Sequence, residues 1–357
     1  GWSARADAAV RLELPAGRLT AAVQAVRHHV LLIPLEGDAA RACEARRVEA
    51  LIACGWLDEA ATVLEGWLTT PARGGRLGGD ALDTAATLQA LDRWRRAVVK
   101  ALPSGVLVVV GRAAEHLARQ ARRSAPERLR PLAAGLGAAH ALLRDGGEAC
   151  AAAQVARWHT ETIHRAGPLP TPPAWDPRAG KGTHGQVTLD AARVALAAVH
   201  DGRDPAGALE WLLGVASPTW AWPEVIDPRL GSGSRGSGHA PDVTAAFALL
   251  GMSLLASGQG DAMDPQVTLD LLPWLPPEWR GQALEVHGLP TAAGRLSFAL
   301  RWHGTRPALL WELAGEGPDV TLGSPGLDPD WSAGGRRGEA LLGVGPAAGG
   351  AGGALVR

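Results

Sequence analysis

Apolar residues recur three and four positions apart through the first 165 residues of the chain. Leu19, Val23, Val26 and Val30 show this spacing, which places them on one face of a helix. The same pattern is interrupted at glycines and prolines, and Asp80 is a favourable residue for the start of a helix. We therefore predict helices at about 17–33, 39–54, 57–70, 81–102, 104–123, 126–145 and 148–165.

The pattern changes twice in the second half of the chain. Residues 167–186 are rich in proline and glycine and predict a long loop. Further helices are expected at 188–200, 204–215 and 240–256, with a glycine- and serine-rich loop at 231–238. After Gly260 apolar residues alternate, as at Val267, Leu269 and Leu271, which predicts strands separated by turns of glycine, proline and aspartate.

Consecutive helices followed by strands leave few architectures open. An open α-solenoid is one, but the chain shows no fixed-period repeat. The other is a closed ring of helical hairpins. We therefore expect a mainly α protein, with an (α/α) toroid over residues 1–260 and a C-terminal antiparallel β-sandwich over 261–345. A flexible tail rich in glycine and alanine is expected at 346–357.

Bulk composition narrows the partners and the compartment. The net charge of −1 gives no general attraction to nucleic acid or to anionic membranes. The chain has no run of 18 apolar residues and no basic-then-apolar signal pattern at its start, so a cytoplasmic protein is expected. Three irregularly spaced cysteines, and histidines such as His28 and His29 without ligand spacing, predict no metal site or cofactor.

The aromatic residues are unusual, with 14 Trp, 2 Phe and no Tyr. A GC-rich genome that favours tryptophan codons is one explanation. Stacking of tryptophan rings on sugar rings is another, because indole combines a flat apolar face with a polar edge. Both explanations can hold together.

The densest group of functional side chains lies at residues 217–239. A loop on a rigid scaffold is where binding residues concentrate, and an apolar wall beside a carboxylate can tune its pKa. A surface loop with incidental polarity is the alternative. The candidate binding residues in this segment are two tryptophans, a glutamate, an aspartate, two arginines and a histidine: Trp220, Trp222, Glu224, Asp227, Arg229, Arg235 and His239.

The run Trp220-Ala-Trp222-Pro223-Glu224, followed by Gly238-His239, resembles a late segment of the glucoamylase-like and glycogen-debranching-like six-hairpin glycosidases. Residues 271–279 and 288–294 resemble the β-domain of the same group. The resemblance implies a toroid that acts on or binds an α-glucoside or related oligosaccharide, by inverting hydrolysis if it is active. Glu224 would then be the general base, and Trp175, Trp220 and Trp222 would form the walls of sugar subsites.

The chain also departs from that family. Residues 38–47 form a plain polar helix where the family carries a Trp-Arg-Asp type motif, and Ser237 stands in place of an aspartate. Inverting hydrolysis needs two carboxyl groups with room for a water between them. Glu161 is the best candidate for the general acid, and a solvated helix residue is the alternative interpretation of it.

These departures keep several functions open. A catalytically lapsed relative would bind carbohydrate or serve as a structural or interaction module. Other toroid chemistry includes polysaccharide lyases, epimerases and terpene cyclases, although the aspartate-rich motif expected of a cyclase is not found. The expected partner is a carbohydrate ligand, and the sequence makes no prediction of the oligomeric state.

Overall fold

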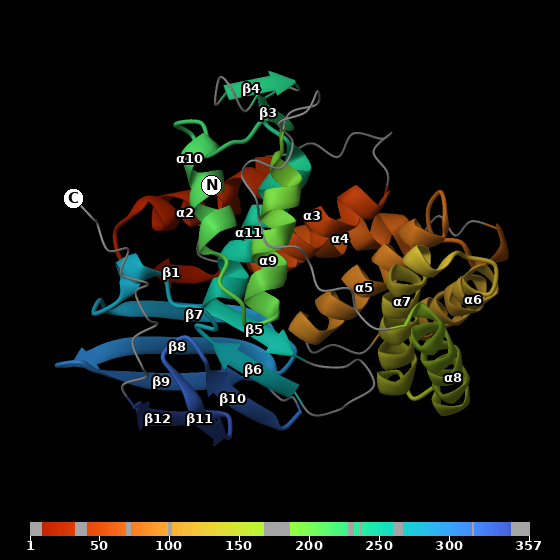
Figure 1. The fold of residues 1–357 in the computed structure, drawn as a ribbon. Helices are drawn as coiled ribbons and strands as arrows, with labels where there is room; N and C mark the ends of the chain where they lie inside the picture. Colours follow the sequence, from red (N-terminus) through yellow and green to blue (C-terminus); the bar gives the residue numbers. More distant parts are fainter. Residues whose placement is uncertain are drawn as a thin grey trace.

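The structure of the chain is a computed structural model. It describes residues 9–32, 41–68, 73–98, 102–167, 186–227, 232–235, 238–259, 267–315 and 318–343. Within these ranges the chain forms ten α-helices and twelve β-strands (Figure 1). The predicted tail at 346–357 and most of the predicted loop at 167–186 lie outside the described residues.

Helices are found where the spacing of apolar residues predicts them. Asp80 starts one of them, because its Oδ1 accepts hydrogen bonds from the backbone N–H groups of Leu82 (2.8 Å) and Asp83 (3.0 Å). None of the described helices combines the length and the apolar character needed to cross a membrane. Their bounds are α2 Arg18–Leu32, α3 Arg41–Ala53, α4 Leu57–Leu68, α5 Ala81–Val98, α6 Ser104–Ala121, α7 Pro126–Asp145, α8 Ala149–Ala166, α9 Thr188–His200, α10 Ala206–Val215 and α11 Pro241–Leu255.

Helix α11 is the centre of the helical part. All of its residues from Val243 to Leu255 are buried, and it packs against α2, α3 and α9. From α3 the packing continues to α5, from α5 to α7, and from α7 to α6 and α8. Figure 1 shows α6, α7 and α8 as a group at one end of the molecule, away from α11.

The prediction of a mainly α toroid is wrong. A toroid requires its inner helices to form a closed ring, but in the described residues no extensive packing joins α7 or α8 to α9. Helix α7 instead buries its apolar surface between α5, α6 and α8, so the row of helices stays open. Because two large sheets accompany the helices, the fold is a mixed α/β fold.

Two sheets lie beside the helices. One has five strands in the order β1-β7-β8-β9-β12, the other has four in the order β11-β10-β6-β5, and a small third sheet has the order β2-β3-β4. The strands are β1 Arg11–Glu13, β2 Gln186–Val187, β3 Val225–Asp227, β4 Ser232–Arg235, β5 Ala256–Gln259, β6 Val267–Leu271, β7 Leu284–Thr291, β8 Gly294–His303, β9 Arg306–Ala314, β10 Val320–Ser324, β11 Asp328–Gly334 and β12 Arg337–Leu341.

The sheets differ from the expected antiparallel sandwich in two respects. Strands β6 and β10 pair in parallel. The sheets also take strands from the first 260 residues, because β1 pairs with β7 and β5 pairs with β6. Residues 260–266 lie outside the described part of the chain, and a domain boundary there stays a prediction.

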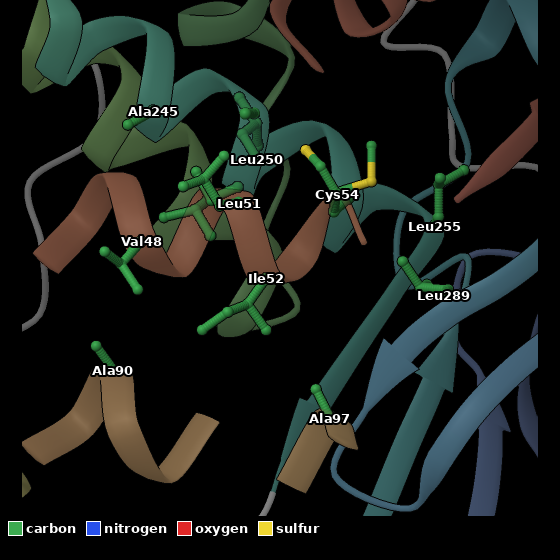
Figure 2. Close-up of a cluster of buried hydrophobic side chains, with 14 of the residues drawn as sticks. Val48, Leu51, Ile52, Cys54, Ala90, Ala97, Ala245, Leu250, Leu255 and Leu289 are labelled. Carbon is green, nitrogen blue, oxygen red and sulfur yellow. The ribbon is translucent and has the colours of Figure 1, made fainter. Parts of the chain in front are cut away.

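The helices and the five-stranded sheet share one apolar core. Figure 2 shows Leu51 and Ile52 of α3 near Leu250 of α11, with Leu289 of β7 and Ala97 of α5 nearby. All five side chains are at most 4% exposed. Burial of this kind contributes about 25 cal/mol per Å² of apolar surface, so the sheet and the helices stabilise one another.

Candidate functional site

The segment that carries the predicted site is more ordered than the expected loop. It leaves α10, forms β3 and β4, and enters α11. Strand β3 pairs with β2 on one side and with β4 on the other, so Val225 lies opposite both Val187 and Arg235. Figure 1 shows β3 and β4 at the edge of the molecule above α9 and α10. The short sheet gives the candidate residues a fixed backbone.

Trp222 is a core residue. Its side chain is 0% exposed, and its ring stacks on Phe247 of α11 with the centroids 4.6 Å apart and the planes at 29°. The indole Nε1 donates a hydrogen bond to the carbonyl of Leu212 (2.9 Å). The expectation that Trp222 forms a sugar subsite wall is therefore corrected, because neither face of its ring is open to a ligand.

Trp220 has a different environment two residues earlier. Its side chain is half-buried, and its backbone adopts φ 60°, a left-handed conformation that is uncommon outside glycine. A turn holds this conformation, because the N–H of Trp220 donates to the carbonyl of Ser217 (2.9 Å). The Cζ of Arg18 lies 6.0 Å from the ring centroid, at the outer limit of a cation–π contact. Part of the ring remains accessible to a ligand.

Glu224 is held by its backbone and has an unsatisfied carboxylate oxygen. The hydroxyl of Thr188 donates to the carbonyls of Pro223 (2.6 Å) and Glu224 (3.3 Å), and the Thr188 N–H also donates to Glu224 (3.3 Å). Within the described part of the chain, Oε2 of Glu224 is buried and has no hydrogen-bond partner. A buried acceptor without a donor costs free energy, so this oxygen is a favourable position for a ligand hydroxyl or a water.

Two histidines meet beside this segment. The rings of His29 from α2 and His239 lie edge to face with centroids 5.4 Å apart. Burial lowers the pKa of His29, the neighbouring His239 lowers it further, and a hydrogen bond to the backbone of Trp220 acts in the opposite direction. His29 is therefore mainly neutral at pH 7. Its single N–H donates to the Trp220 backbone, and its Nδ1, which has no partner among the described residues, can accept a hydrogen bond.

His29 could not be recognised as a site residue from the sequence pattern. It lies 191 positions before Trp220 along the chain, and a single histidine next to another carries no spacing signal. Only the packing of α2 against α10 and α11 brings it to this place.

The other predicted site residues are distributed as follows. Asp227 ends β3 and is partly buried, and Arg235 ends β4. Glu161 is exposed on α8, and Figure 1 shows α8 far from β3, so the structure does not bring it to Glu224. Trp175, Arg229 and Ser237 lie outside the described residues.

A possible metal cluster lies elsewhere. Among the described residues, the ligand atoms of Glu13, Glu285 and His287 come within 4.8 Å of one another on β1 and β7. Guanidinium groups already bind them, because Arg301 pairs with Glu285, and Arg11 lies 3.1 Å from Glu13 and 3.3 Å from His287. These cations oppose the binding of a metal ion.

The candidate site therefore combines the half-buried Trp220 with His29, which contacts the Trp220 backbone and the His239 ring. Glu224 follows four residues after Trp220 on the same segment. A stacking surface on Trp220, a carboxylate acceptor on Glu224 and an imidazole acceptor on His29 suit a ligand that carries hydroxyl groups. Comparison with protein-family models and with curated proteins found no match to this chain.

Proposed function

We propose that this chain binds a carbohydrate, an α-glucoside or a related oligosaccharide, at the site formed by Trp220, Glu224, His29 and His239. The observation that carries the proposal is the buried Oε2 of Glu224, which has no hydrogen-bond partner among the described residues. A sugar hydroxyl would donate to this oxygen and remove the cost of leaving it unsatisfied. The accessible part of the Trp220 ring would stack on a sugar face.

The ligand class comes from the resemblance of residues 220–224 to the six-hairpin glycosidases, and the proposal does not rest on their fold. Binding without turnover is the first candidate because Glu161, the candidate acid, lies far from Glu224 on α8. The proposal also keeps the expectation of a cytoplasmic protein, which cell fractionation would test.

Binding is tested by titrating the purified chain with maltooligosaccharides and trehalose and recording heat and tryptophan fluorescence. Replacing Glu224 with alanine should weaken binding about tenfold or more, which is the usual effect of losing a hydrogen bond to a charged group. Trp220→Ala should weaken it about two- to tenfold through lost stacking.

Matched controls separate the site from the rest of the surface. Glu161→Ala removes an exposed carboxylate on α8, and Trp331→Ala removes a half-buried tryptophan on β11. Both variants should bind as the unchanged chain does. Equal affinity of the unchanged chain and Glu224→Ala would reject the site, and no binding of any sugar in the panel would reject the function.

Inverting hydrolysis is the second candidate. The same free oxygen of Glu224 favours it, because a general base must be able to accept a proton from a bound water. Release of reducing sugar from the same glycosides tests it. Glu224→Gln should lower turnover by about 10²- to 10⁴-fold while sugar binding is largely kept. If the unchanged chain releases no sugar, hydrolysis is rejected and the binding proposal stands or falls on its own titration.

A further inference from the structure

A second polar pocket lies where the helices meet the sheets. It encloses about 480 Å³ and is lined from α3, α5, α7, α9 and α11 and from β5, β6 and β7. The lining residues of α3, α9 and α11 come from the C-terminal halves of these helices, and those of α5 lie between Gln89 and Arg96. The Trp220 and Glu224 site instead precedes the N-terminus of α11. The two sites are therefore distinct.

Part of the pocket wall is apolar. Ile52 of α3, Leu249 of α11 and Leu289 of β7 contribute to it, and Figure 2 shows Ile52 and Leu289 on either side of the junction between α3 and the sheet. The volume is within the range of about 300–1,000 Å³ that is usual for small-molecule sites.

Charged side chains of opposite sign meet on another wall of the pocket. Arg93 approaches Glu49 with Nη1 3.5 Å from Oε2, and the Nε of Arg96 donates to Oδ2 of Asp92 at 2.9 Å. The charges of the two carboxylates and the two guanidiniums cancel. The pocket therefore offers a ligand hydrogen-bond donors and acceptors but has little net charge.

A histidine and a serine add to these groups from the other helices. His200 of α9 and Ser253 of α11 both line the pocket, and Nε2 of His200 lies 3.2 Å from Oγ of Ser253. Polar groups from four helices thus converge on one space, which is the arrangement that fixes the orientation of a small ligand.

Asp92 has a carboxylate oxygen that could accept a hydrogen bond from a ligand. The residue is 8% exposed, and its Oδ1 is buried without a hydrogen-bond partner among the described residues. The Nη2 of Arg95 lies 3.8 Å from this oxygen, beyond hydrogen-bond distance. Burial raises the pKa of Asp92, and the neighbouring Arg96 opposes that change.

We propose that this pocket binds a small neutral molecule with several hydroxyl groups, of the size of one sugar ring or one cyclic polyol. Asp92 Oδ1 accepts a hydrogen bond from one hydroxyl, and the guanidiniums of Arg93 and Arg96 donate to neighbouring oxygens. The carbon face of the ring lies against Ile52 and Leu289. This pocket is independent of the Glu224 site, so either proposal can fail while the other holds.

Other classes of ligand fit the pocket less well. An anion would be repelled by Glu49 and Asp92, and a cation would be repelled by Arg93 and Arg96. An apolar molecule would displace water from these charged groups and leave them without hydrogen bonds. A neutral polyol satisfies donors and acceptors alike.

The test uses myo-inositol and glucose as probes, with inorganic phosphate and benzene representing the other classes. Binding to the full chain is measured by calorimetry and by saturation-transfer NMR. Inositol or glucose should bind, and phosphate and benzene should bind at least tenfold more weakly. Preferred binding of phosphate or benzene, or no binding of either polyol, would overturn the proposal.

Two variants locate the binding. Ala53→Leu fills the pocket from α3, where Ala53 is half-buried and part of the lining. Asp92→Asn turns the free acceptor into a donor, because the amide oxygen stays against Arg96. Each should weaken polyol binding about tenfold or more. If one variant fails to fold, as judged by circular dichroism, the other decides the outcome.

Control variants show which of the two sites binds the probe. Asp190→Asn changes an exposed aspartate at the start of α9, and Trp220→Ala with Glu224→Gln changes the other site. Asp190→Asn should bind both probes within twofold of the unchanged chain. The variant of the Glu224 site should keep its binding of myo-inositol, which is the probe compared here because glucose belongs to the ligand class proposed for that site. Probe binding that is lost in Trp220→Ala but kept in Ala53→Leu would assign the polyol to the Glu224 site and overturn this inference.

Discussion

At the scale of single residues, the environment decides what a side chain can do. Trp220 and Trp222 are two positions apart, yet one is half-buried on a left-handed turn and the other is fully buried against Phe247. A tryptophan in a motif can therefore be a binding surface or a core residue, and its stability effect distinguishes the two.

Replacing Trp222 with alanine should lower the free energy of unfolding by about 3–5 kcal/mol, the usual cost of truncating a buried aromatic residue. Trp220→Ala should cost about 1 kcal/mol, as partly exposed substitutions do. Urea unfolding followed by circular dichroism measures both. Trp222→Phe keeps part of the stacking on Phe247 and should lie between them. Equal losses for the two alanine variants would contradict the assigned environments.

The cysteines should differ in reactivity. Burial raises the pKa of the Cys54 thiol to about 12, so the thiolate fraction at pH 8 is about 10⁻⁴. Cys150 is exposed. Iodoacetamide should label Cys150 and leave Cys54 unlabelled in the folded chain, as read by peptide mass mapping. In urea both should react, and labelling of Cys54 in the folded chain at the rate of Cys150 would refute the prediction.

At the scale of elements, close helix packing depends on small residues. A Cβ added to Gly135 of α7 would lie 2.6 Å from the Cα of Ala85 on α5 and 2.9 Å from Cδ1 of Leu117 on α6. Gly111 of α6 has no such neighbour within 4 Å. The two glycines thus have opposite roles, although the sequence presents both as helix-weakening residues.

Gly135→Ala should destabilise the chain by about 1–3 kcal/mol, because overpacking outweighs the gain in helix propensity. Gly111→Ala should stabilise it by up to about 1 kcal/mol, since only the propensity changes. Midpoints of urea unfolding compare the two variants under identical conditions. A stabilising Gly135→Ala would show that α5, α6 and α7 are not in close contact.

At the scale of the whole molecule, the segment at residues 10–13 joins the helices to the five-stranded sheet. Strand β1 pairs with β7, so Leu12 lies opposite Val286. Val10 donates from its N–H to the carbonyl of Cys54 (3.1 Å), and the buried Arg27 donates to the carbonyl of Val10. Helices α3 and α5 also contact β7. The N-terminal segment thereby links the helices to the sheets.

We expect one cooperative unfolding transition from these links. Far-UV circular dichroism and tryptophan fluorescence should give the same urea midpoint within error. Leu12→Asp places a charge in the core between β1 and β7 and should shift both signals together. Two separate transitions would instead favour independent domains divided near residue 260.

The positions of the helices could be predicted from the sequence because their signals are local. A spacing of three and four residues, an aspartate at position 80 and a glycine at position 55 act within a few turns of the chain. Whether the helices close into a ring could not be predicted from such local signals. Whether α7 packs against α9 depends on surfaces far apart in sequence, and the same apolar face fits more than one partner.

For the candidate site, the sequence by itself determined which chemical groups are available: Glu224 beside two tryptophans, with a proline to hold its backbone. Only the tertiary structure decided that Trp222 is core, that His29 joins the site from α2 and that Asp92 faces a pocket. The physical reason is burial. The exposure and the pKa of a side chain depend on which distant segments of the chain cover it. The residues next to it in sequence do not indicate which segments these are.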